Sequence, residues 1–223
     1  MHSYTIRRAT SAPADLLNFE SSFWEAAEIL KVDHYYPQSS SHHPNVRAKV
    51  LHDEQNLYVV FDVQDRYVRV VAKGYQSMVC KDACVEFFVR PKADKGYLNF
   101  ENSGGGAQLC YYIEDSQRAP DGFKKFTKLP NEWMEQTKIL HSLPSRVEPE
   151  MTDPTHWRLA LTIPRTVLEA YVGPTGKWAG QTWRANFFKC ADESSHPHWA
   201  SWSPVEGKLD FHQPQYFGQI VLA

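Results

Sequence analysis

Short runs in which apolar and polar residues alternate recur along most of the chain, which is the pattern of β-strands. Polar turns that often contain Gly or Pro separate these runs, and two of the turns, at residues 53–56 and 92–96, predict β-hairpins. The sequence therefore predicts a largely β structure. The expected strands are residues 47–52, 57–63, 84–90, 97–102, 108–113, 157–163, 183–188 and 217–222.

Helical signals are few and short. After a pair of serines, residues 23–30 (FWEAAEIL) predict two turns of helix, and Pro164 begins a predicted turn that continues to residue 170. Residues 134–141 fit a strand or a helix equally well. Many short strands with polar turns predict an all-β sandwich with short helical turns. A single domain over residues 1–223 is within the usual size of such a fold.

Strand alternation places three polar residues on one face of two neighbouring strands. In residues 84–90, Glu86 lies on the face opposite to the one that carries Val85, Phe87 and Val89. In residues 97–102, Asn99 and Glu101 lie on the face opposite to Leu98 and Phe100. A carboxylate within a strong strand is unfavourable unless it is solvated or paired. Two interpretations stay open, an ordinary solvated sheet face and a polar surface that forms hydrogen bonds with a ligand. The residues expected on the apolar face are Val85, Phe87, Val89, Leu98 and Phe100.

The last forty residues set two tryptophans, Trp199 and Trp202, among charged and hydrogen-bonding side chains. A sugar ring presents an apolar C–H face and a rim of hydroxyl groups, so exposed tryptophans beside polar groups suit saccharide binding. The alternative is that both tryptophans belong to the core, which is the more common place for any single Trp in a β-rich protein. The neighbouring polar residues are Lys189, Asp192, Glu193, His196 and His198.

Composition and charge exclude several classes of partner. The formal net charge of −2 gives no electrostatic case for nucleic acid or an anionic membrane. No apolar run is long enough to cross a bilayer, and the start of the chain lacks the apolar segment of a secretory signal. The chain is thus expected to be cytosolic, or extracellular or periplasmic if a signal has been removed. The four cysteines form no C-x-x-C pair, which favours a cytosolic protein without a disulfide scaffold.

Four stretches together resemble carbohydrate-binding module family 9 and its stand-alone relatives, the carbohydrate-binding family 9-like proteins. Their order and spacing carry the resemblance, and they span most of the chain. The stretches are Trp24 with Ala27, NLYVVFDVQD (56–65), KDACVEFFVRP followed by GYLNFEN (81–102), and the tail segments WRANFFKCADE, SWSP and YFGQIVL.

The resemblance implies an immunoglobulin-like or jelly-roll β-sandwich that binds saccharides without catalysis, often at chain ends. Members are commonly appended to xylanases and similar enzymes of polysaccharide catabolism. The implied partners are therefore mono- or oligosaccharides and the ends of plant cell-wall polysaccharides such as xylan. The family also implies bound calcium, which we expect to be structural and held by loop oxygens, although the sequence does not identify its ligands.

Three residues match positions of the family pattern. Glu86 is the glutamate of the family's D-x-x-V-E-F pattern, and Trp202 is the tryptophan shortly before the closing F-G strand. Lys189 stands where the family tends to place a basic residue, at the end of the penultimate strand. The predicted ligand-binding residues are Trp202, Trp199, Glu86, Asn99, Glu101 and Lys189.

One departure from the family pattern concerns the aromatic clamp. Family members often carry a tryptophan just before the stretch that contains Glu86, where this sequence has Val79 or Cys80. Half of the clamp is therefore missing. Trp199, Tyr75 or another aromatic residue takes its place, or the ligand differs, or saccharide binding is weak or absent.

Two other functions compete with saccharide binding. A glycoside hydrolase, or an accessory domain of one, would need two carboxylates on either side of the scissile bond. Its candidate residues are Glu86, Glu101, Asp192 and Glu193. A haem-binding sandwich would use Met and His ligands, as related β-sandwich domains do. The candidates for that function are Met78, His42, His43, His196 and His198.

Overall fold

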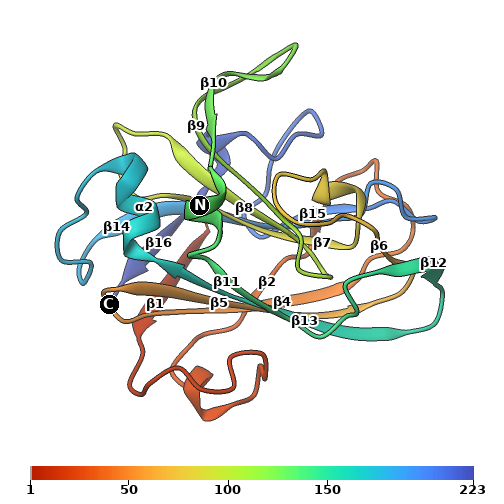
Figure 1. The fold of residues 1–223 in the computed structure, drawn as a ribbon, viewed down its shortest axis with the longest axis horizontal. Helices are drawn as coiled ribbons and strands as arrows, with labels where there is room; N and C mark the ends of the chain where they lie inside the picture. The colour runs from red at the N-terminus through yellow and green to blue at the C-terminus, as the bar shows by residue number, and fades with distance from the viewer. Residues whose placement is uncertain (1) are drawn as a thin grey trace.

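The computed structural model describes residues 2–223 as two β-sheets packed face to face (Figure 1). The first sheet has the order β10-β9-β8-β7-β14-β16-β1, and the short strands β15 and β3 continue it beside β14. Its strands are β1 (Ser3–Arg8), β3 (His34–Tyr35), β7 (Cys84–Arg90), β8 (Tyr97–Ser103), β9 (Gln108–Ala119), β10 (Gly122–Lys128), β14 (Thr182–Cys190), β15 (Trp199–Ser201) and β16 (Gly218–Leu222).

The second sheet has the order β1-β4-β5-β13-β11, with β2 paired to β4. Strand β1 belongs to both sheets, because residues 3–6 pair with β16 and residues 7–8 pair with β4. A separate pair joins β6 and β12. These strands are β2 (Leu30–Lys31), β4 (Asn45–His52), β5 (Asn56–Asp65), β6 (Val68–Val70), β11 (Lys138–His141), β12 (Val147–Met151) and β13 (Thr155–Pro164).

Helical segments are short and peripheral. The α-helices are α1 (Asn131–Met134) and α2 (Arg165–Val172). The 3₁₀ turns are η1 (Ser22–Trp24), η2 (Val79–Lys81) and η3 (Pro214–Tyr216). None of the helices within residues 2–223 is long and apolar enough to cross a membrane.

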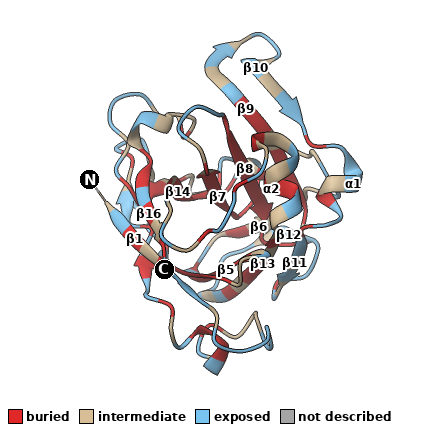
Figure 2. Ribbon diagram, turned by 90° about the vertical axis from the view of Figure 1, so that its left-hand side faces the viewer, coloured by how far each residue is buried: buried red, intermediate tan, exposed pale blue. Residues whose placement is uncertain are grey.

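Apolar side chains fill three layers, one between the sheets and one on the outer face of each. Figure 2 shows the buried residues of the central strands β7 and β8 in red. The layer between the sheets is the largest and includes Phe61, Phe87, Phe100, Trp157 and Phe187. The outer face of the first sheet is covered around Phe88, Phe188, Phe211 and Phe217, and that of the second sheet around Phe19, Trp24 and Tyr58. Each sheet is therefore covered on both faces.

The strand predictions are largely confirmed. The predicted hairpins form as β4–β5 and β7–β8, both antiparallel. The predicted turn of helix after Pro164 is α2. The ambiguous segment 134–141 contains the end of α1 and the strand β11. The all-β sandwich is thus the fold of this chain.

The predicted helix over residues 23–30 is wrong. Only the 3₁₀ turn at Ser22–Trp24 forms, and Leu30 already pairs with Ala48 as part of β2. Phe23 and Trp24 are buried against the outer face of the second sheet. Packing of these two rings on the sheet outweighs the modest helix propensity of the segment.

The predicted facing of the polar residues is confirmed, but their predicted exposure to solvent is wrong. Glu86 pairs with Glu101 across β7 and β8, and Asn99 points to the same outer face. All three are buried, Glu86 with 2% of its surface exposed. The loop that carries Phe211 and the β9–β10 hairpin cover this part of the sheet. Alternation predicts on which face of the sheet a side chain lies. Whether that face is buried depends on segments that are distant in sequence.

Lys189 lies between the sheets, which contradicts its predicted role as a ligand-binding residue. It alternates with Phe188 along β14, so its side chain points inward, and its ammonium lies 3.4 Å from Oδ2 of Asp65 on β5. Nζ also donates to Nε2 of His198 at 2.8 Å. Burial alone would raise the pKa of Asp65, but Lys189 and the hydrogen bond from His42 hold that pKa well below its usual range. Lys189 therefore links the two sheets.

Trp202 also lies in the core, which contradicts its predicted role in stacking on a sugar. Its side chain is 6% exposed and packs edge-on against Phe187 and Tyr4. The ring occupies the space above Gly218, where a side chain would place its Cβ 2.5 Å from Cζ3 of the indole. The tryptophan and the glycine thus form one packed unit of the interior.

The buried position of His198 predicts a pH dependence of stability. Burial, and then the Lys189 cation, lower the pKa of His198 to about 3. In the unfolded chain its pKa is about 6.5, so between these values the unfolded state binds a proton that the folded state excludes. The stability contributed by this group is present above about pH 6.5 and is lost as pH falls toward 3, by up to about 1.4 kcal/mol per pH unit.

We therefore expect His198→Gln, whose side chain does not titrate, to lose the corresponding part of the pH dependence. The free energies of unfolding of wild type and variant would be compared by urea denaturation between about pH 7 and pH 4. The advantage of wild type should be largest at the neutral end and shrink below about pH 6.5. An advantage that stays constant across this range would contradict a neutral His198.

The packing of Trp202 predicts that Trp202→Ala destabilises the protein by about 3–5 kcal/mol, the usual cost of truncating a large core side chain. Trp199→Ala is the matched control, because Trp199 is only half-buried. It should cost less, and circular dichroism during urea unfolding measures both variants. An unchanged midpoint for Trp202→Ala would place this ring outside the core.

Candidate functional site

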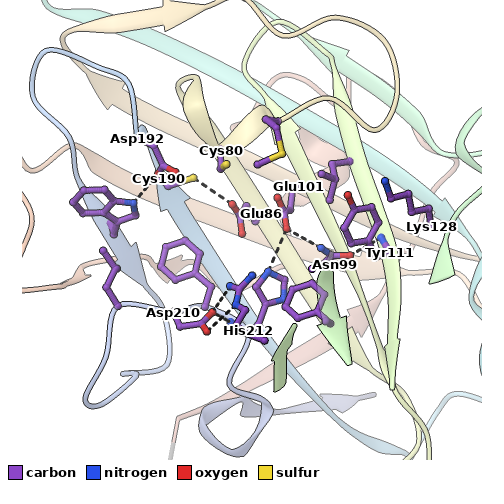
Figure 3. Close-up of a pocket in the computed structure, with 18 of the residues that line it drawn as sticks. Cys80, Glu86, Asn99, Glu101, Tyr111, Lys128, Cys190, Asp192, Asp210 and His212 are labelled. Atoms are coloured by element: carbon purple, nitrogen blue, oxygen red, sulfur yellow. Dashed lines mark hydrogen bonds and ion pairs between the residues drawn. The ribbon is translucent and has the colours of Figure 1, made fainter. Parts of the chain in front are cut away.

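A pocket of about 610 Å³ opens on the outer face of the first sheet (Figure 3). Strands β7, β8 and β9 supply its floor, and β14 with the chain up to β15 supplies one wall. The turn end of the β9–β10 hairpin, the end of β10 at Lys128 and the loop before η3 supply most of the rest. The polar residues that line it are Cys80, Glu86, Asn99, Glu101, Arg118, Asp121, Lys128, Cys190, Asp192, Asp210 and His212, and the larger apolar or aromatic ones are Met78, Leu109, Tyr111, Phe123, Trp199, Leu209 and Phe211.

Two carboxyl groups form the centre of the floor. Glu86 and Glu101 are directly opposite each other in the β7–β8 register. Nδ2 of Asn99 donates to Oε1 of Glu101 at 2.7 Å, and Oδ1 of Asn99 accepts from the backbone N–H of Tyr111. Burial raises the pKa of Glu101 to about 7, and burial together with the Glu101 charge raises that of Glu86 well above its usual value. Both carboxyl groups are therefore harder to ionise than exposed ones.

A neutral histidine lies beside this pair. Burial, followed by the cation of Arg118, lowers the pKa of His212 to about 3. The hydroxyl of Tyr97 lies 2.9 Å from Nδ1, and Nε2 lies 3.7 Å from Oε1 of Glu101. If Nδ1 accepts from Tyr97, Nε2 carries the proton and faces the carboxyl group, an assignment that rests on the hydrogen-bond partners. His212 then presents a donor to the pocket rather than a charge.

A bidentate ion pair fixes the loop that carries His212. Nε and Nη2 of Arg118 contact the two carboxylate oxygens of Asp210 at 3.1 and 2.6 Å. Arg118 comes from β9 and Asp210 from the loop that follows β15, so the pair connects the hairpin to this loop. Both residues line the pocket and offer charged groups to a ligand.

Aromatic side chains stand at opposite ends of the pocket. Trp199 is half-buried, and its Nε1 donates to Oδ1 of Asp192 at 2.7 Å. Tyr111, also half-buried, lies beyond Asn99 at the other end (Figure 3). Phe211 also lines the pocket and stacks on Phe188, with ring centroids 4.2 Å apart. The pocket thus combines a polar floor with ring surfaces on its walls.

A cluster of two thiols and a carboxyl group lies at the Asp192 end of the floor. Sγ of Cys190 is 3.2 Å and Sγ of Cys84 is 3.8 Å from Oε1 of Glu86. Within residues 2–223 this is the one group of three or more His, Cys, Asp or Glu side chains close enough to share a metal ion. Two sulfur donors do not fit Ca²⁺, which takes oxygen ligands. The expected calcium therefore stays a prediction without identified ligands.

The structure brings four of the predicted residues together in the pocket, namely Glu86, Asn99, Glu101 and Trp199. Trp202 and Lys189 lie in the interior instead. At the place of the missing clamp tryptophan, Cys80 lines the pocket while Val79 is buried beneath it. Tyr75 is exposed and does not line the pocket.

Sequence reasoning missed several residues of the pocket. Tyr111 lies within the predicted strand 108–113 and shares the outer face with Leu109, so alternation could have placed it there. Arg118 lies beyond register shifts in the pairing of β9 with β10, so alternation continued from residue 113 would have assigned it to the wrong face. His212 and Asp210 belong to a loop without periodic pattern, so no local signal marked them. These residues are Tyr111, Arg118, Asp210, Phe211 and His212.

The candidate haem ligands are not in one place. Met78 lines the pocket, but none of His42, His43, His196 and His198 does. The rings of His42, His196 and His198 lie near one another beside Asp65, with His42 5.3 Å from His198 and 6.5 Å from His196 between ring centroids. The described residues thus do not combine Met78 with any of the histidines considered for this role.

Several solved structures resemble this chain. A proposed carbohydrate-binding protein from Bacteroides uniformis ATCC 8492 shares 26% identity, with a TM-score of 0.86 and 99% of each chain covered. A carbohydrate binding module family 9 from Caldicellulosiruptor kristjanssonii, in complex with cellotriose, shares 15% identity over 99% of this chain and 93% of that one, with a TM-score of 0.64. The same module in complex with glucose shares 15% identity over 98% of this chain and 95% of that one, with a TM-score of 0.59.

No curated protein matches the chain. The two Caldicellulosiruptor structures share its fold. The model of carbohydrate-binding family 9 matches residues 17–222, which is nearly the whole chain and includes every residue that lines the pocket. The chain therefore belongs to carbohydrate-binding family 9.

Proposed function

We propose that this protein binds a mono- or oligosaccharide, without catalysis, in the pocket on the outer face of the first sheet. The observation that carries the proposal is the combination in one pocket of about 610 Å³ of a hydrogen-bonding floor and aromatic walls. This volume is typical of pockets that hold small ligands. Sugars match such a pocket because they carry both hydroxyl groups and apolar ring faces.

Trp199 and Tyr111 are the ring platforms of this proposal. Each is half-buried, so each has surface left to contact a ligand. The hydrogen bond from Trp199 to Asp192 fixes the indole orientation before a ligand arrives, which lowers the entropy lost on binding. Tyr111, which also lines the pocket, would act as the second platform in place of the family's first clamp tryptophan, which this chain lacks.

Hydroxyl groups of the sugar would meet both donors and acceptors on the floor. Glu101 and Asn99 supply acceptor and donor atoms, and His212 supplies a neutral ring nitrogen. Arg118 and Asp210 add charged groups at the rim, and hydrogen bonds to charged groups are stronger than neutral ones. Such a mixed set suits hydroxyls, which both donate and accept.

The relatives support the saccharide class. The Caldicellulosiruptor module was solved with cellotriose and with glucose, so a β-glucan oligomer or its terminal sugar is a first candidate ligand. The ends of plant cell-wall polysaccharides, xylan included, belong to the same proposal as further candidates.

The carboxyl geometry favours binding over hydrolysis. Glu86 and Glu101 neighbour each other on one sheet face, so both approach a bound sugar from the same side. A glycoside hydrolase instead places its two carboxyl groups across the scissile bond. Asp192 lies on the pocket wall, where its carboxylate accepts a hydrogen bond from Trp199, and Glu193 does not line the pocket.

Trp199→Ala should weaken saccharide binding by about 1–3 kcal/mol, because the ring face that contacts the sugar is lost. Tyr75→Ala is the matched control, since Tyr75 is an exposed aromatic residue outside the pocket. Calorimetric titration with glucose and with cello- and xylo-oligosaccharides measures both. Equal affinities for wild type and Trp199→Ala toward a sugar that binds would remove Trp199 from the site, and no binding of any sugar would refute the proposal.

The protein should release no reducing sugar from xylan, β-glucan or aryl glycosides, because its floor lacks the flanking carboxyl geometry of hydrolysis. Reducing-sugar assays against a buffer blank measure this. Glu101→Gln serves as the reference for any background from contaminating enzymes. Turnover by wild type that disappears in Glu101→Gln would establish a hydrolase instead.

A further inference from the structure

The central strands of the first sheet bring two thiols and one carboxyl group to the same point. Cys84 and Cys190 are directly opposite each other in the register of β7 and β14, and Glu86 follows Cys84 on the same face. Their ligand atoms all lie within 4.8 Å of one another. Each of the three residues is buried, and Glu86 and Cys190 also line the pocket.

The carboxyl group of Glu86 is incompletely satisfied. Its Oε1 accepts hydrogen bonds from the thiols of Cys84 and Cys190. Its Oε2 is buried and has no hydrogen-bond partner among the described residues. Buried polar atoms are almost always paired, so an unpaired one in a native protein points to a missing partner. This partner must reach the atom from the pocket, since the sheet closes the other side.

The chemistry of the cluster points to a cation as that partner. Two thiols and a carboxyl group meet at one point, and each of them is a metal ligand once its proton has left. A cation bound among the three would give the carboxyl group of Glu86 the partner that it lacks.

The donor set selects the kind of cation. Thiolate sulfur favours soft or borderline metals such as Zn²⁺ over Ca²⁺ and Mg²⁺. In a tetrahedral zinc site, with Zn–S near 2.3 Å and Zn–O near 2.1 Å, neighbouring ligand atoms lie about 3.5–3.8 Å apart. The distances of 3.2 and 3.8 Å from the two sulfurs to Oε1 of Glu86 are close to this spacing.

We propose that Cys84, Cys190 and Glu86 form a Zn²⁺ site in the floor of the pocket, with the fourth coordination position open to the pocket. Binding replaces protons by the metal: the thiols and, where it is protonated, the carboxyl group release theirs to solvent as the Zn–S and Zn–O bonds form. No redox step is involved. The site depends on these three side chains and not on saccharide binding, so the two proposals can fail separately.

The test is a titration of reduced, chelator-treated protein with ZnCl₂ alone, followed by calorimetry and by metal analysis after gel filtration. We expect about one equivalent of Zn²⁺ to bind, with release of protons that depends on the buffer. Titration with CoCl₂ should produce the near-ultraviolet absorption of thiolate-to-cobalt charge transfer. Cys84→Ser and Cys190→Ser should weaken Zn²⁺ binding at least about a hundredfold and abolish this absorption, because losing a ligand should cost at least as much as the roughly 10–100-fold typical of losing a group that orients one.

Two further variants keep the test decisive. Cys110→Ala is the matched control, because Cys110 is also a buried free thiol but belongs to the core between the sheets, and it should bind Zn²⁺ like wild type. Glu86→Gln should weaken binding at least about tenfold with both thiols intact. If circular dichroism shows that the serine variants do not fold, the Zn²⁺ affinity of Glu86→Gln and the cobalt spectrum of wild type test the proposed site instead.

Absence of Zn²⁺ binding by reduced wild type would overturn the inference. So would unchanged affinity in a folded Cys84→Ser or Glu86→Gln variant, which would assign the metal to other residues. A calorimetric titration of the zinc-free protein with cellotriose tests the saccharide proposal independently.

Discussion

The register between β7 and β14 is the constraint on which the rest of this protein depends. The two strands meet at the centre of the first sheet, where Val85 faces Lys189 and Glu86 faces Phe188. A slip of one residue would turn every side chain to the opposite face. Lys189 would then leave Asp65 without its cation, and an apolar side chain would replace Glu86 in the pocket floor. One pairing thus determines both the interior of the sandwich and the chemistry of its outer surface.

Alternation made much of the fold predictable from sequence. The apolar faces of β7 and β8 and the two hairpins follow from periodicity and turn residues, which are local properties. The segment at Phe23 and Trp24 could not be predicted in this way, because its conformation is set by burial on a distant sheet. The same is true of the loop around Phe211 that covers the outer face.

The site was partly predictable for the same reason. Glu86 and Glu101 share a face because strands alternate, and this holds whatever covers them. Trp199 and Trp202 carry the same local signal of tryptophan among polar residues, yet only the first lines the pocket. What separates them is a tertiary property, the space above Gly218 that admits one indole. His212 shows the converse, a site residue without any local pattern.

Strand β1 joins the two sheets and has a consequence for how the protein folds. Its first residues pair with β16, at the other end of the sequence, so Ser3 lies beside Gln219. Closing so long a loop costs entropy before the contacts that repay it can form. Proteins dominated by such non-local pairings fold slowly. The two edges that β16 joins, on β14 and on the first residues of β1, therefore stay unpaired until β16 has been synthesised, and during that interval they are open to pairing with other chains.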